Sequence, residues 1–201
     1  ITHVAAGTQA NDAVNLAQLS AATLYFQANP SVNTAAGATV DGDEAVAAGA
    51  AASALGDGAS AFGGGANALA NGATAIGQSA LATGINAAAL GINAQAMADS
   101  SVAVGADALA AGEQSTATGA GAQANGDGSL ASGALALADG LEASAMGFYA
   151  TANGDGASAL GAEALADGET ATAVGFASVA GNDYSTAVGG WAEATGFNST
   201  A

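Results

Sequence analysis

The sequence predicts an all-β fold, a solenoid of short coils, because most of the chain is one repeated unit. Eleven uninterrupted copies of a fourteen-residue unit run from residue 45 to residue 198. In every copy the third residue is Ala, the fifth is Gly and the tenth is Ala. Fourteen residues are too few for two helices and their loops, and each Gly would disfavour a helix by about 1 kcal/mol. The constrained positions alternate instead, which is the periodicity of β-strands.

Turn residues separate the two predicted strands of each unit, at positions six to seven and thirteen to fourteen. Asp-Gly and Gly-Gly pairs stand there, for example at residues 57–58 and 64–65. Each unit should form one flat coil, and coils stacked at about 4.8 Å would make a rod on the order of 50 Å long. The Ala and Gly columns should face inwards, across a gap much smaller than the ~10 Å between ordinary packed sheets.

The fourth position of the unit carries mostly large apolar residues, although its parity places it on the outside of the coil. An uncovered apolar row is not a stable surface for a monomer, and each side chain that becomes covered contributes roughly 1.5–3 kcal/mol. We therefore expect identical chains to associate along this face, with Thr118 and Ser132 as its weakest stretch. The predicted interface residues are Phe62, Ile76, Leu90, Val104, Met146, Leu160, Val174 and Val188.

Two further sets of residues are candidates for a ligand surface. At position nine, Leu alternates with polar residues along the outside of the second strand, which suggests a 28-residue period. These leucines are either incidental, since single exposed apolar residues are common, or part of a contact surface. Aromatic residues in the first turn of the later coils either contact a ligand or pack against neighbouring subunits. The two sets are Leu81, Leu109, Leu137 and Leu165, and Phe148, Tyr149, Phe176 and Trp191.

The composition excludes several classes of function. The chain has no Lys, Arg or Cys and a formal net charge of −17, so it lacks the cations that bind nucleic acid or an anionic membrane surface. With His3 as its one histidine, it also has no Cys, Lys or Arg to act as nucleophile, base or oxyanion partner. We expect a protein that is not an enzyme, uses no cofactor and binds no nucleic acid.

Acidic residues gather at position thirteen, in the second turn. Stacked turns would bring these carboxylates within about 5 Å of one another, and Ca²⁺ prefers clusters of oxygen ligands. The nonapeptide repeat of calcium-binding β-rolls is absent, however, and Ile85, Leu141 and Phe197 interrupt the column. We favour a solvated acidic edge with no metal site, and keep Ca²⁺ binding as the alternative. The acidic members are Asp57, Asp99, Glu113, Asp127, Asp155, Glu169 and Asp183.

Residues 1–44 differ from the repeats. Asn11-Asp12 is a good helix cap, and apolar residues follow it at roughly helical spacing. The sequence therefore predicts a short helix over residues 13–22. Residues 31–44 resemble an imperfect coil that leads into the repeats.

Motifs in both parts of the chain point to one known family. Residues 101–105 and 185–189 match the Ser-x-Ala-x-Gly pattern of its head repeat closely, and residues 1–8 followed by 12–19 are similar to its neck. Residues 25–29 look like its short connector, which leads from a stalk segment into the next head. The chain thus resembles the trimeric autotransporter adhesins with a YadA-like head.

The resemblance implies a fold and a domain order. The head would be a left-handed parallel β-roll over residues 45–201, preceded by a neck and short helix over residues 1–24 and by a connector and lead-in coil over residues 25–44. Three chains would form a homotrimer, so that the apolar row becomes the trimer interface. The residues expected to pack the neck are Val4, Val14, Leu16 and Leu19.

The resemblance also implies a function and a location. The trimer would stand on a bacterial outer membrane and attach to host extracellular matrix proteins or host cells, and residues 1–201 would make no direct contact with the membrane. Because residues 1–7 lack the features of a signal peptide and residues 199–201 begin a twelfth unit, we expect a fragment of a longer, anchored chain. The alternative is a flat β-solenoid that binds a repetitive ligand such as ice, or a Ca²⁺-dependent surface protein.

Overall fold

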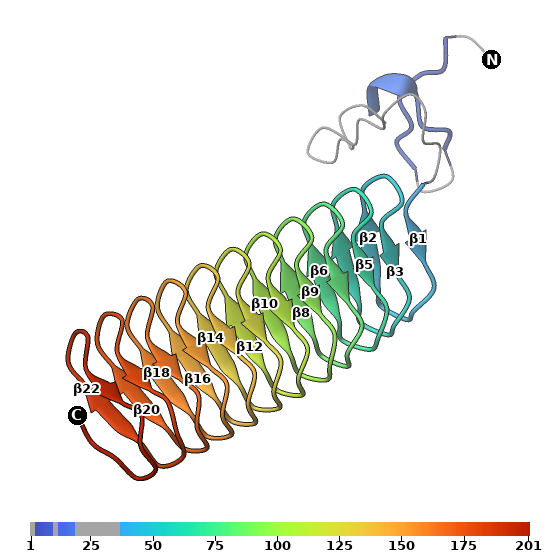
Figure 1. Ribbon diagram of the computed structural model, residues 1–201. Helices are drawn as coiled ribbons and strands as arrows, with labels where there is room; N and C mark the ends of the chain where they lie inside the picture. Colours follow the sequence, from blue (N-terminus) through green and yellow to red (C-terminus); the bar gives the residue numbers. More distant parts are fainter. Residues whose placement is uncertain (1–2, 10–11, 19–36) are drawn as a thin grey trace. The chain divides into compact units, whose positions relative to one another are not determined.

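The structure, a computed structural model, describes residues 3–9, 12–18 and 37–201 (Figure 1). The chain divides into two compact units, Ile1–Ala35 and Ala36–Ala201. The first unit holds the predicted neck, and the second holds the repeats.

The helix of the first unit begins later than the sequence predicts. Within the described residues the backbone is helical at residues 16–18 only, and the rest of the predicted helix lies outside them. The cap is Asn15: its Oδ1 accepts the N–H of Gln18 at 2.9 Å, and the Gln18 Oε1 accepts the N–H of Asn15 at 3.3 Å. This reciprocal pair is a capping box. Asp12, half of the predicted cap, closes the preceding turn instead by accepting two backbone N–H groups at 2.8 Å.

The second unit consists of two parallel sheets, and the chain passes from one to the other and back in every fourteen residues. Even-numbered strands form an eleven-stranded sheet, the even sheet, and odd-numbered strands form a twelve-stranded sheet, the odd sheet. The even strands are β2 (Val46–Ala48), β4 (Ser60–Phe62), β6 (Thr74–Ile76), β8 (Ala88–Leu90), β10 (Val102–Val104), β12 (Thr116–Thr118), β14 (Leu130–Ser132), β16 (Ser144–Met146), β18 (Ser158–Leu160), β20 (Thr172–Val174) and β22 (Thr186–Val188). The odd strands are β1 (Thr39–Val40), β3 (Ser53–Ala54), β5 (Asn67–Ala68), β7 (Leu81–Ala82), β9 (Gln95–Ala96), β11 (Leu109–Ala110), β13 (Gln123–Ala124), β15 (Leu137–Ala138), β17 (Thr151–Ala152), β19 (Leu165–Ala166), β21 (Val179–Ala180) and β23 (Glu193–Ala194).

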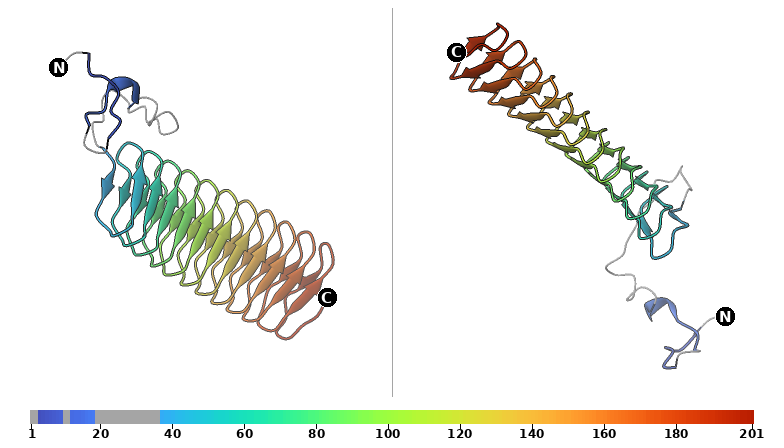
Figure 2. Two further views of the ribbon diagram at one scale, coloured as in Figure 1. Left: turned by 180° about the vertical axis from the view of Figure 1, so that it is seen from behind. Right: turned by 90° about the horizontal axis from the view of Figure 1, so that it is seen from below.

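Each strand pairs in parallel with the strand fourteen residues further on. In the even sheet Val102 pairs with Thr116, and in the odd sheet Leu109 pairs with Gln123. Backbone hydrogen bonds of about 2.8 Å join successive coils throughout the stack. Figure 2 shows from two further directions that the coils form a single row. The prediction of a parallel β-solenoid with fourteen-residue coils is confirmed.

The stacking extends beyond the eleven copies at both ends. Thr39 in β1 pairs with Ser53 in β3, so the predicted lead-in coil is present from residue 37 on, and residues 31–36 lie outside the described part. At the other end Thr200 forms a parallel bridge with Thr186. The residues that flank the repeats therefore keep the same phase.

Methyl groups fill the space between the two sheets. The Ala residues at positions one, three, eight and ten are almost all fully buried, as in Ala103 and Ala110. Cα atoms of facing strands such as β10 and β11 lie within 8 Å of one another. Sheets with ordinary side chains between them pack about 10 Å apart, so the predicted close approach is confirmed. The core of each coil consequently contributes little apolar area.

Serine replaces alanine at position one in the middle coils, and not every hydroxyl is paired. Ser101 Oγ donates to the carbonyl of Ala98 at 2.6 Å. The hydroxyls of Ser115 and Ser129 are buried without a hydrogen-bond partner. A buried unpaired hydroxyl typically costs about 1–3 kcal/mol.

Glycine at position five is required by the stacking and by the turn. The prediction that this column lines the interior is wrong, because these residues are partly exposed and lie in the first turn. Gly105 has a φ of +135°, and a Cβ there would lie 2.5 Å from the carbonyl oxygen of Gly119 in the next coil. Position twelve is stacked as closely, yet Ala70 and Ala98 occupy it in two coils. Of these two positions, only position five combines a positive φ with a clash against the backbone of the next coil, which explains why glycine is invariant there.

We expect Gly105→Ala to lower the free energy of unfolding by about 3 kcal/mol or more, because both the backbone conformation and the contact with the next coil are lost. Gly64→Ala is the matched control, since its Cβ would meet one carbonyl oxygen at 3.9 Å. It should change stability by less than about 0.5 kcal/mol. Urea unfolding followed by circular dichroism measures both variants, and equal midpoints would contradict this account of position five.

Candidate functional site

The outer surface of the even sheet carries the apolar row predicted at position four. The side chains point away from the core, and those of Phe62, Leu90 and Val188 remain 37%, 36% and 60% exposed. The row is continuous in space, because Phe62 pairs with Ile76 and Ile76 pairs with Leu90. The same outward direction holds for all eight predicted residues, Phe62, Ile76, Leu90, Val104, Met146, Leu160, Val174 and Val188. We call this surface the apolar face.

Position two also lies on the apolar face. Leu130, at this position, is an outward-facing apolar residue that the sequence reasoning missed. Leu130 begins β14, whose fourth-position residue is Ser132. Both point outwards with Ala131 buried between them. In this coil the large apolar side chain has therefore moved from position four to position two. Side chains two residues apart on a strand point to the same face. The alternation that predicts an outward direction for position four therefore predicts it for position two as well.

The outer surface of the odd sheet holds the leucines of position nine. Leu109 pairs with Gln95 on one side and Gln123 on the other, so a neutral polar side chain separates successive leucines. Leu81, Leu109, Leu137 and Leu165 are all half-buried. The structure places them in one line, two coils apart, as the sequence predicts.

Aromatic residues line the edge formed by the first turns of the later coils. The rings of Phe148 and Tyr149 meet edge to face with centroids 4.5 Å apart. Those of Phe176 and Trp191, from successive coils, meet in the same way at 5.3 Å. Trp191 is 74% exposed, so the pairing holds the rings in place without covering them. We call these four residues the aromatic edge.

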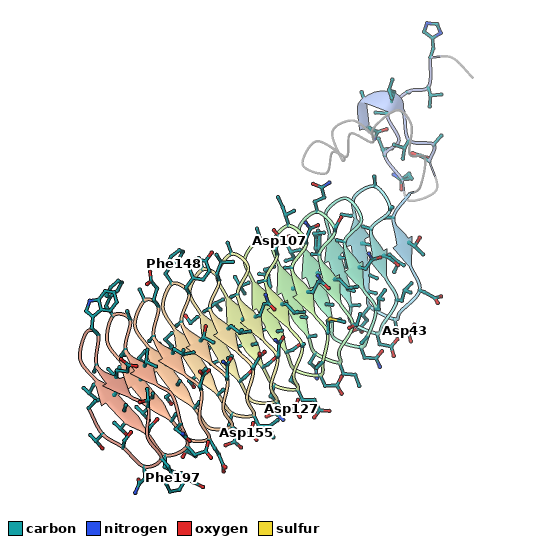
Figure 3. All side chains as sticks on the ribbon, in the orientation of Figure 1. Asp43, Asp107, Asp127, Phe148, Asp155 and Phe197 are labelled. Carbon is teal, nitrogen blue, oxygen red and sulfur yellow. The ribbon has the colours of Figure 1, made fainter. Side chains whose placement is uncertain are left out.

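The second turns form the opposite edge, and their acidic residues have a structural role. Figure 3 shows Asp43, Asp127 and Asp155 along this edge, across the stack from Phe148. Asp127 Oδ1 accepts the backbone N–H of Glu113, the position-thirteen residue of the preceding coil, at 2.8 Å. Sequence reasoning predicted a solvated edge and missed this cap.

The capping side chains recur every second coil. The acceptors, each a short Asp or Asn, are Asn71, Asp99, Asp127, Asp155 and Asp183 at 28-residue intervals, with Asp57 in addition. The residues that donate from the coils between them include Ile85 and Leu141. These apparent interruptions of the acidic column therefore belong to a regular two-coil pattern. The coils between the capping residues carry a longer or an apolar side chain at this position, as at Ile85, Glu113 and Leu141.

The described residues contain no group of three or more His, Cys, Asp or Glu side chains arranged to hold a metal ion. The aspartates of position thirteen point along the stack to backbone N–H groups. Carboxylate oxygens used in this way are partly occupied, so the edge does not have the converging oxygens that Ca²⁺ prefers.

In the first unit, three of the four residues predicted to pack the neck come together. Val4, Val14 and Leu16 line one open hollow with His3, and Leu19 lies outside the described residues. Val14 and Leu16 are 66% and 77% exposed. Their apolar surface has no cover from the described part of this unit.

Comparison with protein families now identifies the repeat. The family model of the YadA head domain repeat, which contains two copies of the repeat, matches residues 41–66, 54–80, 82–108, 110–136, 138–164 and 166–192. The chain belongs to the YadA head family. Heads of this family are non-enzymatic, homotrimeric adhesive domains of trimeric autotransporters, which are anchored in the outer membrane and exposed at the cell surface. A comparison with curated proteins gave no match.

Within the described ranges of this YadA-type head, no helix has both the length and the hydropathy needed to cross a bilayer.

We expect Asp127→Ala to lower the free energy of unfolding by about 1 kcal/mol, because the N–H of Glu113 loses its acceptor. Asp127→Asn should have a smaller effect, since Asn71 fills the same role elsewhere in the stack with an amide oxygen 3.1 Å from the N–H of Asp57. Thermal unfolding of both variants at one pH measures the difference. Equal losses for Ala and Asn would mean that charge, and not the cap, gives this column its stability.

Proposed function

We propose that the chain is the head of a homotrimeric adhesin, in which three left-handed β-rolls associate through their apolar faces and attach to host matrix proteins or host cells. The observation that carries the proposal is the continuous outward row of large apolar side chains on a solenoid whose own core is almost entirely Ala. Membership of the YadA head family supports a trimer.

The distribution of charge favours self-association through this face. None of the seventeen acidic residues occupies position two or four in any of the eleven coils. Within the coils the acidic side chains lie on the odd sheet and in the two turns instead. Three copies can therefore bring their apolar faces together without burying a carboxylate, which would be costly in the absence of any cationic partner.

The energetics point the same way. Burying a large apolar side chain stabilises an assembly by roughly 1.5–3 kcal/mol, whereas a buried methyl group contributes much less. The isolated coil stack obtains its stability from Ala methyl groups and backbone hydrogen bonds. The trimer interface would therefore supply much of the apolar core that each roll lacks.

An attachment surface must stay accessible after assembly, and two sets of residues are candidates for it in the proposed trimer. The odd sheet faces away from the apolar face, so its leucines would point outwards. The aromatic edge offers rigid rings that lose little conformational entropy on binding, a property common to residues that dominate protein interfaces. We assign the attachment surface to the aromatic edge, because its rings are far more exposed than the half-buried leucines.

We expect Val104→Asp to dissociate the trimer, because three carboxylates would be buried against one another. Gln123→Asp, which places the same charge on the outer surface of β13, should leave the trimer intact. Sedimentation equilibrium of the full chain and of both variants gives the mass of each assembly. A stable monomer for the unchanged chain would overturn the proposal, and thermal hysteresis of such a monomer would favour an ice-binding solenoid.

The attachment role is tested by binding the full chain to immobilised matrix proteins and to host cells. We expect Trp191→Ala to weaken binding by about tenfold, the effect of removing one well-placed aromatic contact, with an unchanged sedimentation profile. Leu137→Ala on the odd sheet is the matched control and should bind normally. A smaller assembly for Trp191→Ala would instead assign the aromatic edge to contacts between subunits.

A further inference from the structure

The apolar face is so regular that most of it cannot distinguish one coil from the next. A shift of one chain by one coil, about 4.8 Å, would place Leu90 beside the neighbouring chain's position-four residue from the coil before or after, which is again apolar. Such a slip loses contact only at the two ends of the stack. Regular strands are prone to register errors of this kind, and proteins suppress them with irregular features.

Two coils place the larger apolar side chain at position two instead of position four: the first coil, with Val46 and Ala48 at the end of the row, and one in the middle of it, with Leu130 and Ser132. Leu130 is the one leucine at position two, and Ser132 is the one serine at position four, among the eleven copies. The coil before it has Thr116 and Thr118 at these positions, which pair with Leu130 and Ser132 in the sheet. The coil after it returns to the common arrangement, with a small residue at position two and Met146 at position four.

We infer that the exchanged pair, Leu130 with Ser132, sets the register of the three chains; this rests on the proposed homotrimer. When the chains are aligned, the small Ser132 side chains meet one another, and the Leu130 side chains beside them fill the space that Ser132 leaves. A slip of one coil puts Ser132 opposite Met146 or Thr118 of another chain. The bulk of Leu130 then meets the wrong surface, and an unfilled space remains at Ser132.

Both errors are unfavourable, since a cavity and an overpacked contact each destabilise an interface. A single irregular layer that fixes register while weakening the interface is a known solution in coiled coils, where one polar residue in an apolar seam has this effect. The exchanged pair acts in the same way, as one irregular layer that fixes register. Its serine removes apolar contact from the face, and the alignment of the chains is what the exchange provides.

The absence of cysteine from the chain makes the register measurable. Leu160→Cys and Val174→Cys chains, mixed, refolded together and oxidised, can form disulfides only between residues that lie close in the trimer. When the chains are aligned, disulfides form between cysteines at the same position of different chains. Chains that have slipped by one coil join position 160 to position 174. Because the sequence offers trypsin no site, cleavage at acidic residues followed by mass spectrometry identifies the pairs.

The decisive variant is Leu130→Ser combined with Ser132→Leu, which restores the common pattern at unchanged composition. We expect like-to-like disulfides alone in the unchanged background, and a rise of about tenfold or more in the mixed disulfide with the double exchange. The control, Gln123→Leu with Leu137→Gln, makes an equivalent exchange on the odd sheet and should give like-to-like disulfides.

The outcomes separate this inference from the proposed function. A monomeric unchanged chain overturns the trimer, and the inference with it. A trimer that keeps like-to-like disulfides after the double exchange, or that gives mixed disulfides before it, overturns the inference and leaves the trimer standing. Loss of the trimer in the double exchange would also overturn the inference, because the pair would then determine affinity and not alignment.

Discussion

Close stacking of successive coil backbones is the constraint on which the rest of this protein depends. Parallel hydrogen bonds hold each coil to the next, and the two sheets approach so closely that only a methyl group or a hydroxymethyl group fits between them. The first turn can follow the stack only with Gly at position five, where a Cβ would strike the carbonyl of the next coil. Because the inside is reserved for small residues, every large side chain must lie outside. The large apolar side chains that would pack an ordinary core therefore lie on the surface.

Much of this arrangement could be predicted from the sequence. The fourteen-residue period, the two strands and the outward direction of position four all follow from the alternation of small and variable residues. The prediction that the position-five glycines line the interior was wrong, because the need for glycine there comes from a contact between successive coils. Spacing along one coil cannot show that Gly105 approaches Gly119. The helix start was misplaced for a related reason, since Asn15 and Gln18 form the cap through a reciprocal contact that competes with the one expected at Asp12.

The functional surfaces were predictable in part. Sequence parity found the apolar row, but Leu130 was overlooked because only the column with the most apolar residues attracted notice. The acidic column was recognised as a column and not as a set of caps. The capping role becomes evident only when Asp127 and Glu113 are seen in contact, since a hydrogen bond between a carboxylate and a backbone N–H fourteen residues apart leaves no mark in the sequence. The identity of a ligand depends on shape complementarity with another molecule, which no pattern within this chain records.

Each coil touches only the coils before and after it, and the hydrogen bonds, caps and core contacts repeat with it. Duplication of a gene segment that encodes one coil would therefore lengthen the head by about 4.8 Å without disturbing any existing contact. The length of the head can thus evolve in steps of about 4.8 Å while the fold, its edges and its apolar face stay the same.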